Sequence, residues 1–196
     1  MQKNYEESAE KHKLVHSSFR IKENVSKALE REAQRRGVTN SSLVNKILEE
    51  YLTCDIYFEH LGFILVSKDF LRSVFTQLKE KEQIEEMGRK LGQIAATEYV
   101  SFFYPEVNID TLIQFLGLWF RRFQLYQHRK SSDDGITSRT RVHSFTINHD
   151  INMNFSLALK SMLGGLIEPI ALAPVSFNTV TDGTIAFSFE SQSSSP

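Results

Sequence analysis

Two histidines and an aspartate in the C-terminal third of the chain are of the types that bind divalent metal ions. Imidazole and carboxylate groups suit several such ions, and the residues concerned are His143, His149 and Asp150. They would form a site if the chain folded them toward His60 or His128. On a straight strand, however, His143 and His149 would share a face about 20 Å apart. We therefore expect hydrogen-bonded or exposed histidines here and no metal site.

Cys54 is the only cysteine of the chain, which excludes an internal disulfide and a cysteine-based zinc site. As a nucleophile it would need a nearby base and an oxyanion hole, and nothing in the sequence supplies them. Gly164 and Gly165 lie inside a helical pattern, and the sequence contains no glycine-rich phosphate loop. We expect no enzymatic activity and no cofactor.

Aromatic residues are concentrated between positions 102 and 126. The side chains concerned are Phe102, Phe103, Tyr104, Phe115, Trp119, Phe120, Phe123 and Tyr126. They could line an apolar ligand pocket, and they could equally form a core or a dimer interface. Of these alternatives we favour a core.

Basic charge is concentrated near the N-terminus, although the whole chain has a formal net charge of -1. Residues 11–48 contain nine lysines and arginines against three glutamates, so this segment carries about +6 and the rest about -7. Such asymmetry fits an anionic partner for the basic segment and a solvated helix surface equally well. We favour the solvated surface for four of these cations, which are Lys27, Arg31, Arg35 and Arg36.

The composition is that of a globular protein, with 41% hydrophobic and 11% aromatic residues. No run approaches the roughly 18 apolar residues of a membrane span, and the polar N-terminus is unlike a signal peptide. We expect a soluble, cytoplasmic protein that does not bind membranes. Residues 1–14 are expected to be a flexible arm and residues 191–196 a disordered tail.

The first ordered element is expected to be a short strand at residues 15–21, where side chains alternate with a period of two. A helix over residues 23–36 follows, and Gly37 supplies the left-handed position that ends it. Thr39 can cap a second amphipathic helix that continues to Leu52. The order is strand, helix, turn, helix.

A strand this short has no partner within its own segment, and its unpaired edge makes it unstable alone. A second copy of the chain is the simplest remedy, because two antiparallel copies form a two-stranded ribbon over four helices. The residues that this homodimer would bury are Phe19, Ile21, Val25, Leu29, Leu43, Ile47 and Leu48. The opposite ribbon face, with His16, Ser18 and Arg20, is left for solvent or DNA.

The segment SFRIKENVSKALEREAQRRGVTNSSLVNKILEEYL resembles the ribbon-helix-helix regulators of the MetJ, Arc and CopG type. The resemblance covers about 40 of 196 residues and rests on the strand alternation, on Gly37 and on the VTNSSL entry to the second helix. The chain departs from the family pattern at Ser17, where a larger apolar residue is usual. The resemblance implies a domain at residues 15–53 that binds double-stranded DNA as a homodimer, with its ribbon in the major groove.

The resemblance also implies roles for individual residues. Base edges would be contacted by His16, Ser18 and Arg20, and Arg20 is the strongest candidate because a guanidinium can bridge guanine O6 and N7. The start of the second helix would lie on the DNA backbone, since free N–H groups and the positive helix end attract phosphate. The phosphate contacts would come from Lys13, Lys22, Thr39, Asn40 and Ser41.

Residues 54–190 are expected to form a larger α+β domain, with a mostly antiparallel sheet and helices packed on one side. Strands are predicted at residues 60–67, 123–129, 141–147, 175–180 and 184–190, and the hairpin signal Asp182-Gly183 joins the last two. Helices are predicted at residues 68–78, 82–104, 108–120 and 152–167, with Pro105 and Pro169 beyond two of them. Residues 130–137 are expected to be a loop.

The stretch NHDINMNFSLALKSMLGGLIEPI, with the terminal hairpin, resembles the small-molecule-binding domains of the vinyl-reductase type, which are similar to subunits of the TRAPP trafficking complex. This resemblance covers a minority of the domain and implies a sensing or dimerising role. The leading hypothesis is a homodimeric, sequence-specific DNA-binding transcription regulator whose C-terminal domain adds sensing of a small-molecule effector, oligomerisation or both. The alternatives are an antitoxin-like interaction protein and a small-molecule-binding domain with a DNA tether.

Overall fold

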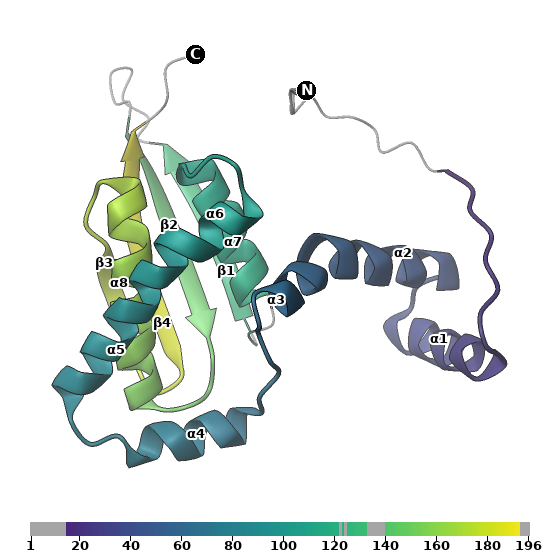
Figure 1. Ribbon diagram of the computed structural model, residues 1–196, viewed down its shortest axis with the longest axis horizontal. Coiled ribbons are helices and arrows are strands. Elements are labelled where there is room, and N and C mark those ends of the chain that lie inside the picture. The colour runs from purple at the N-terminus through teal and green to yellow at the C-terminus, as the bar shows by residue number, and fades with distance from the viewer. Residues whose placement is uncertain (1–14, 122, 124, 133–139, 193–196) are drawn as a thin grey trace. The chain divides into compact units, whose positions relative to one another are not determined.

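A computed structural model describes residues 15–121, 123, 125–132 and 140–192 of the chain. The chain divides into two compact units, Met1–Thr53 and Cys54–Pro196. Figure 1 shows the elements of both. The expected arm at residues 1–14 lies outside the described residues, as do residues 133–139 of the expected loop and residues 193–196 of the expected tail.

The N-terminal unit contains two helices, α1 (Glu23–Arg36) and α2 (Asn40–Glu50). Gly37 ends α1 in the left-handed conformation, with φ 66°, and its N–H donates to the carbonyl groups of the last helical turn. Thr39 caps α2, because its hydroxyl accepts the Ser42 N–H at 3.1 Å. Both predicted helices are therefore confirmed, together with the residues that end the first and begin the second.

The predicted ribbon strand is not formed in the single chain. Residues 15–22 are described as neither helix nor strand, and their side chains are exposed. The second helix also differs from its predicted end at Leu52: a π-helical turn, Tyr51–Asp55, and a short helix, α3 (Ile56–His60), follow α2 directly. Helical backbone hydrogen bonding therefore continues beyond Leu52, the predicted end of the second helix, as far as His60.

The C-terminal unit contains one antiparallel sheet with strands in the order β1-β2-β4-β3. The bounds of the strands are Leu125–Ser132 for β1, Thr140–Asn148 for β2, Ser176–Val180 for β3 and Thr184–Gln192 for β4. The predicted hairpin joins β3 to β4, and the Thr181 N–H donates to the Thr184 carbonyl at 2.9 Å. The α+β class is confirmed.

Helices cover one face of this sheet. Their bounds are Lys68–Gln77 for α4, Lys81–Ile94 for α5, Val100–Phe103 for α6, Ile109–Phe120 for α7 and Met153–Ala171 for α8, with a π-helical turn at Ala95–Tyr99. In Figure 1, α5 and α8 run together across the strands. Asn108 begins α7 with a reciprocal capping box to Thr111.

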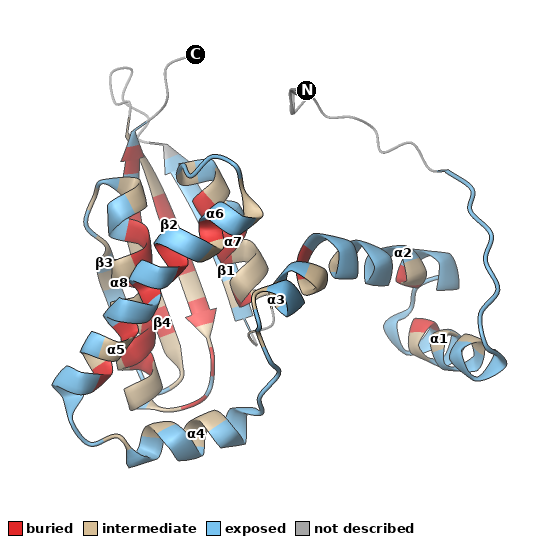
Figure 2. Cartoon of the chain, viewed as in Figure 1, coloured by how far each residue is buried: buried red, intermediate tan, exposed pale blue. Residues whose placement is uncertain are grey.

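The core lies between the helices and the sheet. Alternate residues of β2 and β4 are buried, as the period of two requires, and Phe145 faces Phe187 with ring centroids 5.0 Å apart. Figure 2 shows the buried positions gathered on α7, α8 and the central strands. Of the predicted aromatic group, Phe115 and Phe120 are buried in the core and most of the others pack around it, so these rings serve as core.

Four sequence predictions for this unit were wrong in detail. Residues 60–67 are not a buried strand: a turn at Gly62 follows α3, and Ile64 and Leu65 are 81% and 86% exposed. A strand needs a neighbouring strand, and the four strands of the sheet pair without this segment. A short apolar run does not specify such a partner.

The other three corrections concern boundaries. Pro169 lies inside α8, which ends at Ala171. Its missing N–H costs α8 one hydrogen bond near the C-terminus. The packing of the rest of the helix offsets this loss, so α8 continues past the proline. Residues 130–132 belong to β1 and not to a loop. Ser191 and Gln192 belong to β4 and not to a tail, since they pair with β2.

Glycines bring the backbones of α5 and α8 into direct contact. The α-carbons of Gly88 and Gly92 lie against the backbone of Ala158 and Met162, and a Cβ atom at either position would overlap those carbonyl oxygens. Gly165 of α8 lies in the same way against the backbone of α5. The two helices consequently pack as one layer over the sheet.

We expect Gly92→Ala to destabilise the C-terminal unit by about 1 to 3 kcal/mol or more, because the added methyl group must displace the α8 backbone. Gly117→Ala is the matched control: its Cβ would meet only the Tyr126 hydroxyl at 3.9 Å, so the helix should gain stability. Urea unfolding measures both changes. Equal stabilities for the two variants would contradict the role of Gly92.

Candidate nucleic-acid interface and buried polar groups

The two helices of the N-terminal unit bury very little between them. Ala33 is the buried residue of α1, and Leu43 that of α2. Figure 2 shows the other described residues of this unit as exposed or intermediate. A pair of helices with so small a core has little hydrophobic burial to offset the entropy of folding.

The predicted dimer-core residues are largely open in the single chain. Leu43 is buried between the helices and Leu29 is half-buried. The exposed members of the set are Phe19, at 60% exposure, and Ile21, Val25, Ile47 and Leu48. These exposed apolar side chains are available to a partner, as the predicted dimer requires.

The three predicted base-contacting residues, His16, Ser18 and Arg20, have exposed side chains in the segment before α1. No ion pair joins the Arg20 side chain to another residue in the described part of the chain. The single chain therefore leaves these groups available to a partner but does not arrange them as a ribbon face.

The predicted phosphate contacts occur at two helix starts. Lys22 precedes α1 and is exposed. The Thr39 hydroxyl is occupied by the Ser42 N–H, so Thr39 orients the start of α2 through its cap. Asn40 and Ser41 are exposed in the first turn of α2, where backbone N–H groups lack acceptors within the helix. Lys13 lies outside the described residues.

Most cations of α1 are paired within the helix itself. Lys27 binds Glu23 at 2.6 Å, and Arg35 and Arg36 both bind Glu32, at 2.6 and 2.5 Å. Hydrogen bonds from Arg35 and then Arg36 lower the pKa of Glu32 to about 2. These pairs support the solvated-surface interpretation of α1.

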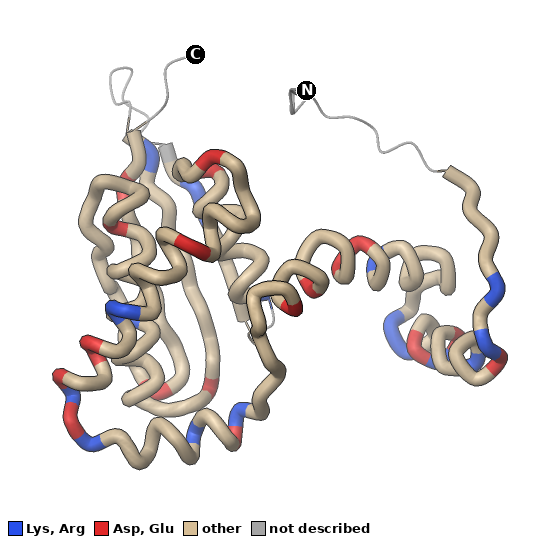
Figure 3. The backbone as a smooth tube through the Cα atoms, in the orientation of Figure 1, with Lys and Arg blue, Asp and Glu red and all other residues tan. Residues whose placement is uncertain are grey.

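The cations outside those pairs are differently placed. Arg20 and Lys22 precede α1, and Lys46 lies on α2. Arg31 lies on α1 and donates to the Lys27 carbonyl at 3.3 Å. Within the described residues, none of these four cations has a carboxylate partner. Figure 3 shows the basic positions along the N-terminal unit. Because Glu49 and Glu50 outnumber Lys46 on α2, the net positive charge of the described N-terminal residues lies mainly in the approach to α1.

A line of hydrogen-bonded side chains crosses three strands of the C-terminal sheet. His128 Nε2 lies 3.1 Å from His143 Nδ1, and His143 Nε2 lies 3.0 Å from Ser191 Oγ. Burial, followed by the charges of His128 and Lys130, lowers the pKa of His143 to about 4. A serine beside a histidine is a nucleophile arrangement, but Ser191 and His143 are both buried, and their hydrogen bonds join neighbouring strands of the sheet.

His149 belongs to a second buried group, at the turn between β2 and α8. The Ile151 N–H donates to His149 Nδ1 at 3.2 Å, so Nε2 carries the ring proton and donates to Ser156 Oγ at 2.9 Å. The Ser156 hydroxyl in turn donates to the Thr181 carbonyl at 2.5 Å. Burial, and then the charge of Lys68, lowers the pKa of His149 to about 4.

The same turn is held from the other side by α4. Arg72 donates to the carbonyl groups of Asp150, at 2.8 Å, and Ile151, at 3.1 Å. Asn154 donates to the Phe75 carbonyl at 2.8 Å. The polar residues of this turn are therefore used in fixing α4 and α8 to the sheet.

The structure does not assemble the metal site considered from the sequence. His143 bonds to His128 and Ser191, whereas His149 bonds to Ser156 and Ile151. Among the residues that the structure describes, no three His, Cys, Asp or Glu side chains lie close enough to hold a metal ion. Nor is any helix in that part of the chain long and apolar enough to cross a membrane.

No family model, no curated protein and no solved structure matches the chain.

The sequence did not indicate that His128, His143 and Ser191 lie together. The alternating pattern of each strand showed which face a residue takes, but the register that brings the three residues side by side is a property of the sheet.

We expect the C-terminal unit to lose stability as the pH falls from about 6.5 to about 4. The folded pKa values of His143 and His149, about 4, lie below the ordinary value near 6.5, so the unfolded chain takes up protons first. Each histidine should remove up to about 3 kcal/mol over this window. The free energy of urea unfolding, measured across these pH values, gives the slope.

The variant His149→Gln is the comparison for that slope. It should lower stability at neutral pH, because it disturbs the bonds to Ile151 and Ser156, yet show a shallower loss toward pH 4. The same slope for both proteins would exclude His149 as a source of the pH dependence.

Proposed function

We propose that this protein is a homodimeric, sequence-specific DNA-binding transcription regulator of the ribbon-helix-helix type. One observation carries the proposal: the helix pair α1–α2, which follows the basic residues Arg20 and Lys22, leaves its apolar residues exposed in the single chain. A second copy of the same surface is the partner that such a small helical unit needs, because it supplies both the missing core and the missing strand.

The dimer explains the position of each group in the N-terminal unit. Pairing residues 15–21 of two copies places Phe19 and Ile21 on the helices and turns His16, Ser18 and Arg20 to the opposite face. The backbone N–H groups of Asn40 and Ser41, which the Thr39 cap does not engage, then meet phosphate. Affinity comes mainly from the phosphate contacts and specificity from the ribbon.

In this proposal, the C-terminal unit oligomerises the protein or senses a small-molecule effector. It has a substantial buried core of its own, which an antitoxin-like protein with a disordered binding segment would not need. Oligomerisation by this unit would tie two DNA-binding modules together, and an effector bound to it would alter their spacing.

We expect Arg20→Ala to lower the preference for the specific site roughly 10- to 100-fold without dissociating the dimer, because one bidentate base contact is lost. Arg35→Ala is the control, since Arg35 is paired with Glu32 on the surface of α1, and its site preference should match that of the parent protein. Binding to genomic DNA fragments at two salt concentrations, followed by sequencing, measures the preference. Weak binding that salt erases, with no enriched site, would refute the proposed function.

We expect Phe19→Ala and Leu29→Ala to raise the dissociation constant of the dimer roughly 100-fold or more, because each removes a large side chain from the shared core in both copies. Leu172→Ala is the matched control: Leu172 is equally apolar and is 90% exposed, but it lies in the C-terminal unit. Sedimentation over a range of protein concentrations gives the constants. A change equal to that of Leu172→Ala would place the dimer interface elsewhere.

A further inference from the structure

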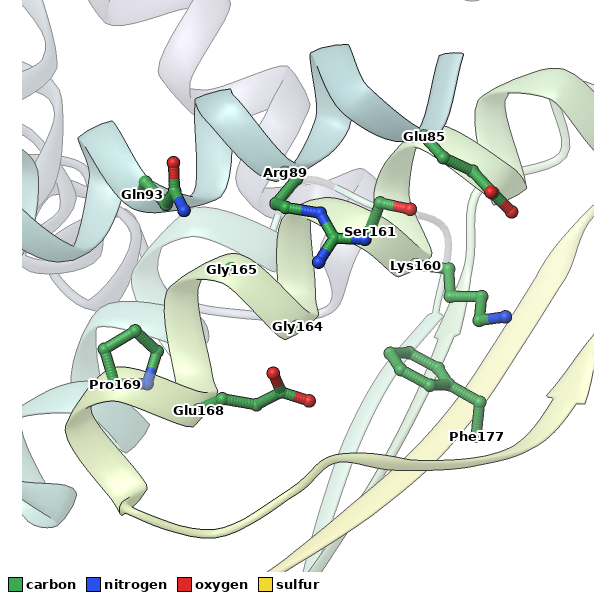
Figure 4. A pocket seen from close by; sticks show the side chains of 10 residues that line it. All are labelled: Glu85, Arg89, Gln93, Lys160, Ser161, Gly164, Gly165, Glu168, Pro169 and Phe177. Atoms are coloured by element: carbon green, nitrogen blue, oxygen red, sulfur yellow. The ribbon is translucent and has the colours of Figure 1, made fainter. Parts of the chain in front are cut away.

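A groove of about 300 Å³ lies on the C-terminal unit between α5, α8 and β3. Figure 4 shows the side chains around it. Arg89 and Gln93 come from α5, Lys160, Gly164 and Glu168 from α8, and Phe177 from β3. The volume is at the lower end of the range of small-molecule pockets.

Gly164 is the first unusual feature of the groove. A glycine in the middle of a helix makes the helix about 1 kcal/mol less stable than an alanine would. The neighbouring Gly165 has a structural reason for this cost, because it lies in close contact with α5. Gly164 has none: a Cβ there would meet only the Glu168 side chain, at 3.8 Å. Helix packing would therefore accept alanine, whereas a side chain at this position would fill part of the groove.

The charged side chains of the groove that lack an engaged partner of opposite charge are cationic. In the described part of the chain, neither the Arg89 guanidinium nor the Lys160 ammonium has a carboxylate partner. The two acidic side chains nearby are each engaged: Glu85 with Lys81 at 3.8 Å, and Glu168 with the Val175 N–H at 3.3 Å. The groove therefore offers more uncommitted donors than acceptors.

Phe177 provides a flat apolar wall beside these cations. Lys160 Nζ lies 5.6 Å from the centre of the Phe177 ring, within the range of a cation–π contact. Figure 4 places Gly164 among Arg89, Glu168 and Phe177, with the guanidinium of Arg89 reaching from α5 toward α8. An aromatic surface, a bare helix backbone and a bidentate donor thus border one space.

We propose that this groove binds a small carboxylate that carries one aromatic ring. The ring lies over the bare backbone at Gly164 and against Phe177, as aromatic pairs prefer. The carboxylate accepts two hydrogen bonds from Arg89, whose planar fork matches carboxylate geometry, and Lys160 adds its charge. The function of such a ligand as an effector rests on the proposed regulator, but its binding to the groove does not.

The test measures binding to the full chain in the absence of DNA, so that its failure is separate from a failure of DNA binding. The probes are benzoate, acetate, phenol and inorganic phosphate, titrated by calorimetry and by the amide NMR signals of Gly164 and Gly165. Benzoate should bind saturably and shift those signals, while each probe that lacks the ring or the carboxylate should bind at least about tenfold more weakly. Equal binding of acetate or phosphate, or no saturable binding of benzoate, overturns the proposal.

Two pairs of variants test the residues. Arg89→Gln should weaken benzoate binding roughly 10- to 100-fold, and Arg129→Gln, at an exposed position of β1, should leave it unchanged. Gly164→Ala should raise the Tm by about 3 °C through helix propensity and still weaken benzoate binding, whereas Gly117→Ala should raise the Tm alone. Unaltered benzoate binding in Arg89→Gln and Gly164→Ala overturns the assignment to this groove.

Discussion

The direct contact between the backbones of α5 and α8 is the constraint on which the C-terminal unit depends. Gly88, Gly92 and Gly165 allow this approach because they have no side chains at the crossing. Dispersion between two backbones at contact distance replaces the interdigitated side chains of an ordinary helix pair. The helices then form a thin layer over the buried rings of β2 and β4, and a groove stays open at Gly164, where this layer meets β3.

The N-terminal unit is stabilised differently. Its two helices bury Ala33 and Leu43, and its ends are set by local groups, the Gly37 turn and the Thr39 cap. Local caps contribute about 1 kcal/mol each, which cannot replace a core. A second chain supplies the burial in the proposed dimer, and the same step duplicates Arg20 and Lys22, two of the cations that have no carboxylate partner in the described part of the chain.

Several side chains that could perform chemistry are used to hold the fold. His149 fixes the turn between β2 and α8 through its two ring nitrogens, and Arg72 fixes the same turn from α4. His143 joins β1 to β4 through His128 and Ser191. Buried polar groups of this kind need complete hydrogen bonding, and their loss of solvent is also what lowers the pKa of both histidines.

The sequence by itself determined the local elements: the α1–Gly37–Thr39–α2 order, most C-terminal helices and the hairpin at Asp182. These follow from neighbouring residues, through periodicity, caps and turn conformations. Only the tertiary structure decided that residues 60–67 stay out of the sheet, that His128 meets His143, and that Arg89 and Phe177 border one groove. Strand pairing and helix crossing bring together residues far apart in the chain, and no local pattern encodes which distant residue becomes the neighbour.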